Sequence, residues 1–459
     1  MTPPPDFVDK DALIAALMAR IDEQAEQISA LIARNLALTA RIAELEAKLG
    51  LPRKTPDNSS LPPSAGQKPS GSAPPKSKGK PHAGAHRPLH PNPTRRRDVM
   101  GTVCACGADV SGVAQAAVEA YDRIEIPKIE PDVTRVILHG GVCPCCAKAF
   151  KASPPEGLEP GSPFGPNLRA YVIYLRSVQG IPLARLSAVL LDLFGLEISE
   201  GALVNILKAA RPAFAQQADR IKADLLSGCV IASDETGMRV GKKTRWLWVF
   251  HHGMSALFLG AQSRAKTVVG DFLGDHRPDY WISDRYGSQM GWALKGHQVC
   301  LAHLIRDTRY QMEAGDTVLA PAFMAVLKRA CAIGRRRHRL ADATLKVYER
   351  QLDKRIDAIL DLTPINAAGR ALLKIIKKVR SQLFVFITNR ALTATNNGSE
   401  QALRPCAVYR KITNGFRSEW GAHSYADIRS AVETGRRRAT RAIDAIRITL
   451  QNQPITIPA

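Results

Sequence analysis

The chain has 459 residues, 45% of them hydrophobic, so it can bury sizeable cores and divide into about three domains of ordinary size. Its 64 Lys and Arg against 42 Asp and Glu give a net charge of +22, which favours a polyanionic partner. We find no apolar run of 18 residues and no signal peptide in the sequence, and therefore expect a cytoplasmic protein without a membrane partner.

Residues 8–50 predict one long helix with a heptad repeat. Ile or Leu fills nine of the eleven a and d positions, which are Ile14, Ile21, Ile28, Asn35, Ile42 and Leu49 at a, and Leu17, Gln24, Leu31, Leu38 and Leu45 at d. Ile at a with Leu at d favours a parallel two-stranded coiled coil, and one Asn at a fixes its register. A helix packed on its own protein is the alternative. We expect this segment to join copies of the chain into a homodimer or a higher oligomer.

Residues 51–100 predict a disordered basic linker. Eleven of the 30 prolines lie here, among many Ser, Gly and Lys and almost no large apolar residue. Such a composition cannot build a core. The basic run 95–97 either touches a nucleic-acid backbone or is a solvated cluster of charges.

Residues 101–155 carry two groups of cysteines. The chain has nine cysteines, and this odd number favours reduced thiols over a disulfide framework. Cys104 and Cys106 precede a β-like stretch, and Cys143, Cys145 and Cys146 follow it. Four thiolates on either side of a hairpin are typical of a zinc ribbon. We predict Cys104, Cys106, Cys143 and Cys146 as Zn²⁺ ligands, with Cys145 as a substitute. Cysteines without a metal are the alternative.

Residues 160–222 predict a helical region. An apolar-periodic helix starts at Leu168, a second covers 182–194, and a third follows Gly195 with Ser199 as its cap. A helix-turn-helix that places Asn205 and Lys208 toward DNA is one interpretation. Plain helical packing is the other.

Residues 223 onward predict alternating strands and helices. Short apolar runs rich in β-branched and aromatic residues mark strands at 228–233, 246–250, 256–259 and 280–283, with a helix at 266–273 before the last strand. Asp234 would end the first strand beside a hairpin whose polar turn covers 236–244. Asp284 would end the fourth strand.

A third acid, Glu400, follows Asn396 and Asn397, either of which can cap a helix, so it should lie in the first turns of that helix. The segment of about 305–390 predicts an inserted helical domain with basic faces. His297, Cys300 and His303 open it at metal-like spacing, but no fourth ligand is evident, and we favour a structural or DNA-positioning role for them.

The contexts of the three acids are Ile-Ala-Ser-Asp234-Glu-Thr, Trp-Ile-Ser-Asp284-Arg-Tyr and Asn-Asn-Gly-Ser-Glu400. They resemble the catalytic triad of DDE transposases, and most of the chain resembles the large transposase of insertion-sequence family sixty-six, which cuts and joins DNA ends. The family usually has Asp where this chain has Thr395. Glu235 is the alternative to Asp234, but adjacent strand residues face opposite sides of a sheet.

The resemblance implies an α/β RNase H-like catalytic core over 223–459, a mixed sheet with flanking helices and the helical insertion. A coiled coil, a linker, a zinc-ribbon-like module and a helical domain would precede this core. Asp234, Asp284 and Glu400 would hold Mg²⁺ or Mn²⁺, because two divalent ions stabilise the attacking and leaving oxygens of phosphoryl transfer and prefer oxygen ligands.

The segment after Glu400 also matches the family, and it supplies the predicted DNA contacts Arg404, Arg410, Lys411 and Arg417. The implied partners are double-stranded DNA, as transposon ends and target, and small accessory proteins of the same element, in the bacterial nucleoid. Two alternatives stay open. One is a nuclease with the same core, and the other is a non-catalytic DNA-binding protein with a vestigial triad.

Overall fold

The computed structural model describes residues 10–48, 52–59 and 87–457. Contacts divide the chain into two units. The first takes in the described residues within 1–66, 154–188 and 198–459, and the second those within 67–153 and 189–197. No helix of the described part is both long and apolar enough to cross a membrane.

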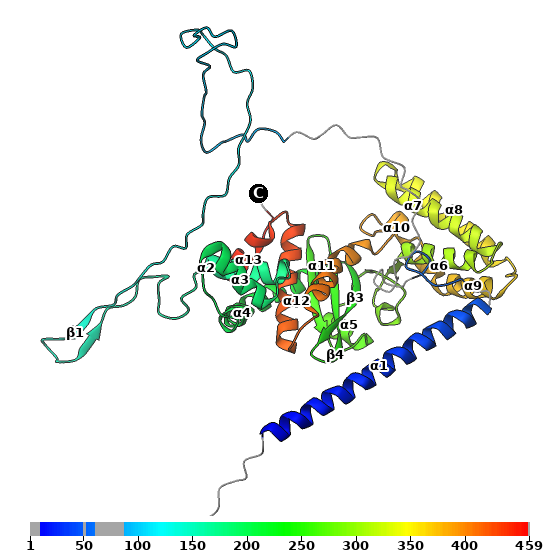
Figure 1. Cartoon of the computed structure of the whole chain (residues 1–459). Helices are drawn as coiled ribbons and strands as arrows, with labels where there is room; N and C mark the ends of the chain where they lie inside the picture. The colour runs from blue at the N-terminus through cyan, green and yellow to red at the C-terminus, as the bar shows by residue number, and fades with distance from the viewer. Residues whose placement is uncertain (1–9, 49–51, 60–86, 458–459) are drawn as a thin grey trace, which may run out of the picture. The chain divides into compact units, whose positions relative to one another are not determined.

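The second half of the chain contains one five-stranded sheet (Figure 1). Its strands are β3 (Val230–Val240), β4 (Lys243–His252), β5 (Ser255–Ala261), β6 (Tyr280–Ser283) and β7 (Gly296–Val299), in the spatial order β5-β4-β3-β6-β7. β3, β4 and β5 are antiparallel neighbours, whereas β6 runs parallel to β3 and β7 parallel to β6. Helix α5 (Lys266–Leu273) connects β5 to β6, as predicted.

Two expectations about this sheet were wrong. The segment expected as a polar turn continues β3 to Val240, since Thr236 pairs with Leu247 and Met238 with Arg245, and Gly241 then turns the chain with φ of +58°. Asp234 therefore lies within a strand and not at its end. The fifth strand, β7, was not expected, because its four residues Gly-His-Gln-Val carry no apolar run.

Both faces of the sheet are covered. On one face, α11 (Asn397–Thr413) and α12 (Glu419–Arg437) pack on a core that includes Met238, Val249, Phe258, Tyr409 and Tyr425. On the other face, α5 and the end of α4 (Glu200–Leu226) enclose Trp248, Phe250, Phe272 and Trp281. Aromatic stacking contributes there, with the rings of Phe250 and Phe272 3.9 Å apart.

The helices predicted before the sheet are present. They are α2 (Pro166–Ile173), which continues as a π-helical turn to Val178, α3 (Leu183–Phe194) and α4. Ser199 caps α4, because its hydroxyl accepts a hydrogen bond from the amide of Ala202 at 3.2 Å. The buried side of α4 joins α2, α12 and α13 (Ala442–Leu450) in one core.

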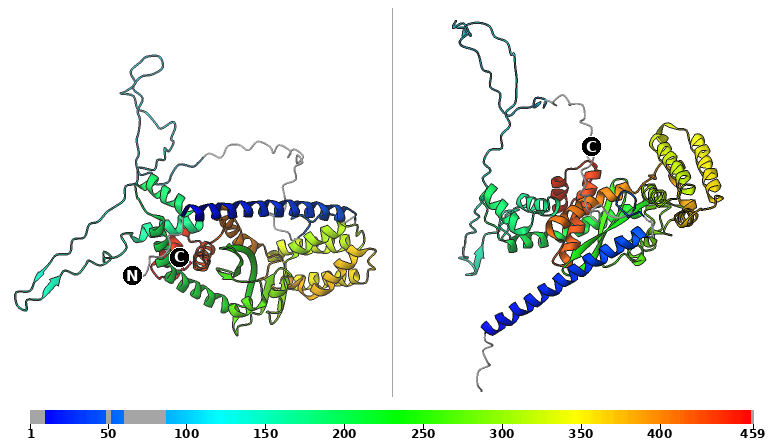
Figure 2. Two further views of the ribbon diagram at one scale, coloured as in Figure 1. Left: turned by 60° about the horizontal axis from the view of Figure 1, so that its bottom comes forward. Right: turned by 45° about the vertical axis from the view of Figure 1, so that its right-hand side comes forward.

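Helices also fill the chain between β7 and Glu400. They are α6 (Leu301–Glu313), α7 (Leu319–Arg336), α8 (Asp342–Leu360), α9 (Ala367–Val379) and the short α10 (Val385–Thr388). Their core is continuous with the sheet through Val230, Ile282 and Val299. In Figure 2, α7 and α8 lie side by side in yellow tones. The predicted insertion is therefore helical, and it begins at Leu301.

Part of the predicted linker packs on α6, so the expectation of an unpacked segment over 51–100 was wrong for 53–59. The side-chain amide of Asn58 donates to Glu313 Oε2 at 2.6 Å, and Arg309 donates to the carbonyl of Asp57 at 3.1 Å. The Lys54 ammonium lies 5.4 Å from the centre of the Tyr310 ring. Residues 60–86 lie outside the described residues, and 87–100 are exposed without helix or strand.

In the second unit, β1 (Gly140–Val142) and β2 (Ala149–Lys151) form an antiparallel hairpin whose turn carries Cys143, Cys145 and Cys146. The Cys143 amide donates to the carbonyl of Lys148 at 2.9 Å. Around Cys104 the chain makes a second tight turn, closed by the Gly107 amide on the Cys104 carbonyl at 2.8 Å. Each cysteine group thus sits on its own turn.

The predicted heptad lies on one uninterrupted helix, α1 (Lys10–Lys48). Its apolar a and d side chains that the structure describes, from Ile14 to Leu45, are 44–59% exposed. Leu49 lies outside the described residues. A stripe of this length left open in a single chain favours a second helix as its cover.

We expect removal of residues 1–50 to lower the assembly state, because the heptad side chains would lose their partner. Light scattering of the full chain and of the shortened chain measures this directly. Within the full chain, Ile28→Lys should dissociate the assembly, while Ala33→Lys, at a solvent-facing heptad position, should leave it intact. An unchanged mass for both the shortened chain and Ile28→Lys would contradict the coiled coil.

Candidate active site

The structure brings Asp234 and Asp284 together at two neighbouring parallel strands, with Asp234 within β3 and Asp284 directly after β6. Ala232 of β3 pairs with Ile282 of β6, and each acid follows its paired residue by two positions. Side chains two positions apart along a strand share a face, so the two carboxylates lie next to one another. Glu400 lies in the first turn of α11, which packs on β3. The predicted helix position of Glu400 is confirmed.

Burial and mutual repulsion define the electrostatics of the site. Burial, followed by the negative charges of Asp284 and Glu235, raises the pKa of Asp234 well above its ordinary value. Burial also raises the pKa of Asp284, although a hydrogen bond from the Tyr286 amide at 2.8 Å opposes this shift. In the described part of the chain, neither carboxylate has a Lys, Arg or His within ion-pair distance. Two adjacent, half-buried acids without an ion-pair partner are costly when both are ionised, although the positive charges of Arg264 and Arg285 favour the ionised form of Asp284.

Glu235 has a different environment from Asp234. Its buried carboxylate forms an ion pair with Arg264 and accepts a hydrogen bond from Gln289 Nε2 at 2.5 Å. The Arg264 guanidinium is held in turn over the rings of Tyr286, at 3.8 Å, and Trp246, at 4.6 Å. Glu235 therefore already has its cation and anchors the loop after β5. This supports Asp234 as the metal-facing acid.

Asn396 ties the loop before Glu400 to β3, the strand of Asp234, and to the start of α6. The side chain is 2% exposed, and its amide donates to the carbonyl of Ser233 at 2.8 Å. Its backbone amide donates to Cys300 Sγ at 3.1 Å, and the Ser399 hydroxyl donates to its side-chain oxygen at 2.6 Å. Sequence reasoning treated Asn396 only as a helix cap, and in the structure the side chain makes no cap hydrogen bond.

The carboxylate of Glu400 faces the start of α6. Glu400 Oε1 lies 3.6 Å from Arg306 Nη2 and 3.9 Å from His303 Nδ1. Cys300, His303 and Glu400 form a set whose possible ligand atoms all lie within 4.8 Å of one another, and no other such set of three occurs among the described residues. The three predicted acids do not form such a set among the described residues: Asp234 and Asp284 lie next to one another, whereas Glu400, whose negative charge also acts on Asp234, groups with Cys300 and His303. His297 points elsewhere, with Nε2 3.0 Å from the Ser283 hydroxyl.

The cysteines predicted as zinc ligands stay in two local groups. Within the described residues, Cys104 and Cys106 do not meet Cys143 and Cys146 in a single site. Hydrogen bonds from the backbone and thiol of Cys106 lower the pKa of Cys104, and those from Cys146 and Cys145 lower the pKa of Cys143. Both shifts favour thiolates, the form that binds a metal. Zinc binding stays a prediction.

The residues predicted to contact DNA differ in how exposed their side chains are. Arg404, Lys411 and Arg417 are exposed on or just after α11. Arg410 is half-buried and donates to the carbonyl of Gly237, so it links α11 to β3 in addition to any contact with DNA. On α4, Asn205 is exposed, whereas the Lys208 ammonium lies 5.5 Å from the centre of the Trp420 ring.

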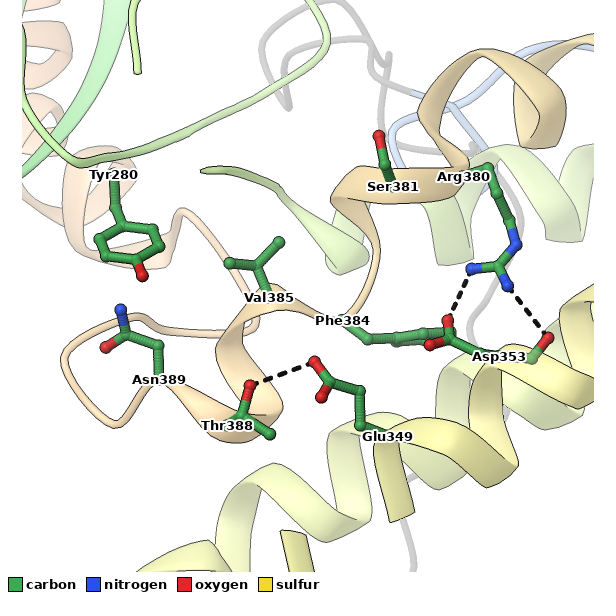
Figure 3. Close-up of a pocket in the computed structure, with 9 residues that line it drawn as sticks. All are labelled: Tyr280, Glu349, Asp353, Arg380, Ser381, Phe384, Val385, Thr388 and Asn389. Carbon is green, nitrogen blue, oxygen red and sulfur yellow. Dashed lines mark hydrogen bonds and ion pairs between the residues drawn. The ribbon is translucent and has the colours of Figure 1, made fainter. Parts of the chain in front are cut away.

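A pocket of about 230 Å³ lies away from the acids, at the start of β6 (Figure 3). Its charged side chains bind one another. Arg380 Nη1 lies 2.6 Å from Asp353 Oδ1, and the Thr388 hydroxyl donates to Glu349 at 3.1 Å. Because its charged side chains are paired within the protein, the described residues of the pocket offer no free charged group to a ligand. We interpret it as a gap in the packing of α8 against α10.

A mixed five-stranded sheet with helices on both faces, with Asp234 on β3, Asp284 directly after β6 and Glu400 on α11, is consistent with the core of a DDE-type transposase. Residues 161–424, more than half of the chain, match the family model described as Transposase IS66 family. The chain belongs to this family, as the sequence motifs predicted, and membership implies an enzyme that binds and cuts DNA. A comparison with curated proteins gave no match.

Proposed function

We propose that the chain is the DDE-type transposase of an insertion sequence, with an RNase H-like core that cleaves the terminal repeats and joins them to target DNA. The observation that carries the proposal is the placement of half-buried Asp234 and Asp284 side by side, with no ion-pair partner in the described part of the chain and with Glu400 nearby at the start of α11. Incubating the full chain with labelled transposon ends, target DNA and Mg²⁺ tests it, since joined products distinguish a transposase from a nuclease.

The acids fit a hard divalent cation. Mg²⁺ and Mn²⁺ take carboxylate oxygens, and Asp234 and Asp284 offer these side by side in a half-buried place, where their mutual repulsion is only partly offset by the more distant charges of Arg264 and Arg285. When bound between these carboxylates and the DNA phosphate, such ions stabilise the attacking and leaving oxygens of phosphoryl transfer. Glu400 would complete the ligand set, and Asn396 holds the start of its helix in register with β3.

Positively charged residues next to the acids would hold the DNA. Arg404 follows Glu400 by one helical turn, about 6 Å along the axis, so an exposed guanidinium stands next to the place proposed for the scissile phosphate. Lys411 and Arg417 extend this charge along the same segment. We propose that these three residues hold the DNA backbone while the acids act, which is the usual role of non-specific phosphate contacts.

Two further parts of the proposal concern assembly. The exposed heptad of α1 would pair two copies of the chain, so that each copy cuts one transposon end.

The two cysteine groups would hold one Zn²⁺ if the turns around Cys104 and Cys143 close on each other. Double-stranded DNA is the substrate in this account, and small proteins encoded by the same element are proposed accessory partners.

Metal binding should stabilise the protein more as the pH rises. Because the folded-state pKa of Asp234 is raised above the ordinary 3.8, the cation-free protein loses stability as the pH rises from that value through the raised pKa. A cation that binds the ionised form offsets this loss. We expect the melting temperature with Mg²⁺ or Mn²⁺ to exceed that in a chelator, with a gap that widens toward neutral pH.

Asp234→Asn should raise the melting temperature of the cation-free protein at neutral pH, because the buried charge is gone, and should abolish most of the gain from Mn²⁺. The exposed Asp275→Asn is the matched control and should behave like the wild type. Equal gains from Mn²⁺ in the wild type and in Asp234→Asn would place the cation elsewhere.

A further inference from the structure

Cys300, His303 and Glu400 converge although 97 residues separate the last two. Cys300 is the N-cap residue of α6 and His303 lies in its first turn, so the two side chains share one face of the helix end. The hydrogen bond from the backbone amide of Asn396 to Cys300 Sγ holds the start of α11, and with it Glu400, against that face. A possible ligand atom of each residue lies within 4.8 Å of the other two.

Two of the three side chains present buried polar atoms that lack hydrogen bonds. His303 Nδ1 and Glu400 Oε1 have no hydrogen-bond partner, although both atoms are shielded from solvent. Buried polar atoms are normally hydrogen-bonded, and each one without a hydrogen bond requires an explanation such as a missing ion. His303 Nδ1 and Glu400 Oε1 lie 3.9 Å apart, and a possible ligand atom of each residue lies within 4.8 Å of the Cys300 sulfur.

We propose that Cys300, His303 and Glu400 form a binding site for Zn²⁺ or a similar borderline cation. Zn²⁺ takes thiolate, imidazole and carboxylate ligands, and zinc sites with three protein ligands keep a fourth position open to water. The same set is unsuited to Mg²⁺, which takes oxygen ligands. Binding replaces the thiol proton of Cys300, which leaves to solvent, and no other covalent bond changes.

Occupation of this site would inhibit the enzyme. Glu400 is the proposed third catalytic acid, and its carboxylate cannot complete the Mg²⁺ site on β3 and β6 while it is bound beside α6. This consequence rests on the proposed function, whereas zinc binding itself does not. Zinc and the catalytic cation would thus compete for one side chain.

Two arginines place positive charge next to the site and disfavour the binding of a cation, which gives a second test of it. Arg306 Nη2 lies 3.6 Å from Glu400 Oε1, and Arg285, which forms an ion pair with Asp307 on α6, also adds positive charge near His303. Arg306 must leave Glu400 before a cation binds there. Removing its charge should therefore strengthen zinc binding, which is the opposite of the effect of removing a ligand.

The test is a competition between the full-length protein and a chromophoric chelator for Zn²⁺. Cys300→Ser and His303→Ala should each bind one zinc ion fewer than the wild type, or bind it about tenfold or more weakly. Cys331→Ser on α7, outside the set, is the matched control and should bind as the wild type does. Arg306→Gln should bind more tightly, a gain that misfolding cannot produce.

Equal zinc affinity and number in the wild type, Cys300→Ser and Arg306→Gln would overturn the site. The inhibitory role is read separately, from DNA joining in Mg²⁺. Micromolar-range additions of Zn²⁺ should slow joining by the wild type and Cys331→Ser, and less Zn²⁺ should suffice for Arg306→Gln. Zinc binding without any effect on joining would overturn inhibition alone. A wild type that joins no DNA would instead contradict the proposed function, and the zinc counts would still decide the site.

Discussion

Asp284→Asn should lower DNA cleavage and joining by several orders of magnitude while leaving DNA affinity nearly unchanged. The amide keeps the size of the side chain but removes the negative charge that would hold a divalent cation between β6 and β3. Loss of an interaction made in the transition state lowers the rate, not the affinity. Affinity survives because it derives from many Lys and Arg contacts in a chain of net charge +22.

The measurement is strand transfer of labelled ends, with affinity from a gel-shift titration of the same DNA. Asp275→Asn, an exposed acid after α5, is the matched control and should retain wild-type joining. Asp284→Asn protein that joins ends at near wild-type rates would leave the acids without a catalytic role. In that case a DNA-binding function with a vestigial triad would be the better account.

Asn396→Ala should destabilise the protein by roughly 2–4 kcal/mol and reduce DNA cleavage. The substitution removes the bond to the Ser233 carbonyl and leaves that carbonyl and the Ser399 hydroxyl short of a partner in the core. His251 would also lose order, because its Nε2 lies 2.9 Å from the same hydroxyl. Without this tie the start of α11 is no longer fixed against β3, and Glu400 moves with it.

Urea unfolding of the full chain measures the first effect and strand transfer the second. The neighbouring Asn397 is exposed at the first position of α11, so Asn397→Ala should change both quantities little. If both alanine variants unfold at the same urea concentration, the buried network around Asn396 contributes nothing measurable. Loss of activity in Asn397→Ala alone would move the positioning role to the exposed residue.

Local sequence signals were sufficient for most elements around the acids, although not for the full length of β3, the strand of Asp234. Apolar runs placed β4, β5 and β6, and the Ser199 cap and Gly195 turn placed α4. The Asn-Asn-Gly-Ser-Glu400 motif placed the third acid in a first helical turn. Each of these depends on residues a few positions apart, for which periodicity and capping rules are reliable.

Contacts between distant residues were beyond such reasoning. The partner of Glu235 is Arg264, 29 residues away, and Asn58 binds Glu313 across 255 residues. Cys300 and His303 lacked a further ligand in the sequence, because Glu400 reaches them only when α11 folds against α6. β7 was not predicted for another reason. Its four residues, Gly-His-Gln-Val, contain no apolar run that would indicate a strand.

The central claim is that Asp284 acts by binding the catalytic cation, and exchange of the ligand atom tests it most directly. Sulfur is a poor ligand for Mg²⁺ but an acceptable one for the softer Mn²⁺. Joining by Asp284→Cys should therefore be measured in each metal beside Asp284→Ala. The account predicts that the cysteine variant joins ends in Mn²⁺ and not in Mg²⁺, while the alanine variant joins in neither. Joining by Asp284→Cys that is the same in both metals, or no better than that of the alanine variant in Mn²⁺, would contradict it.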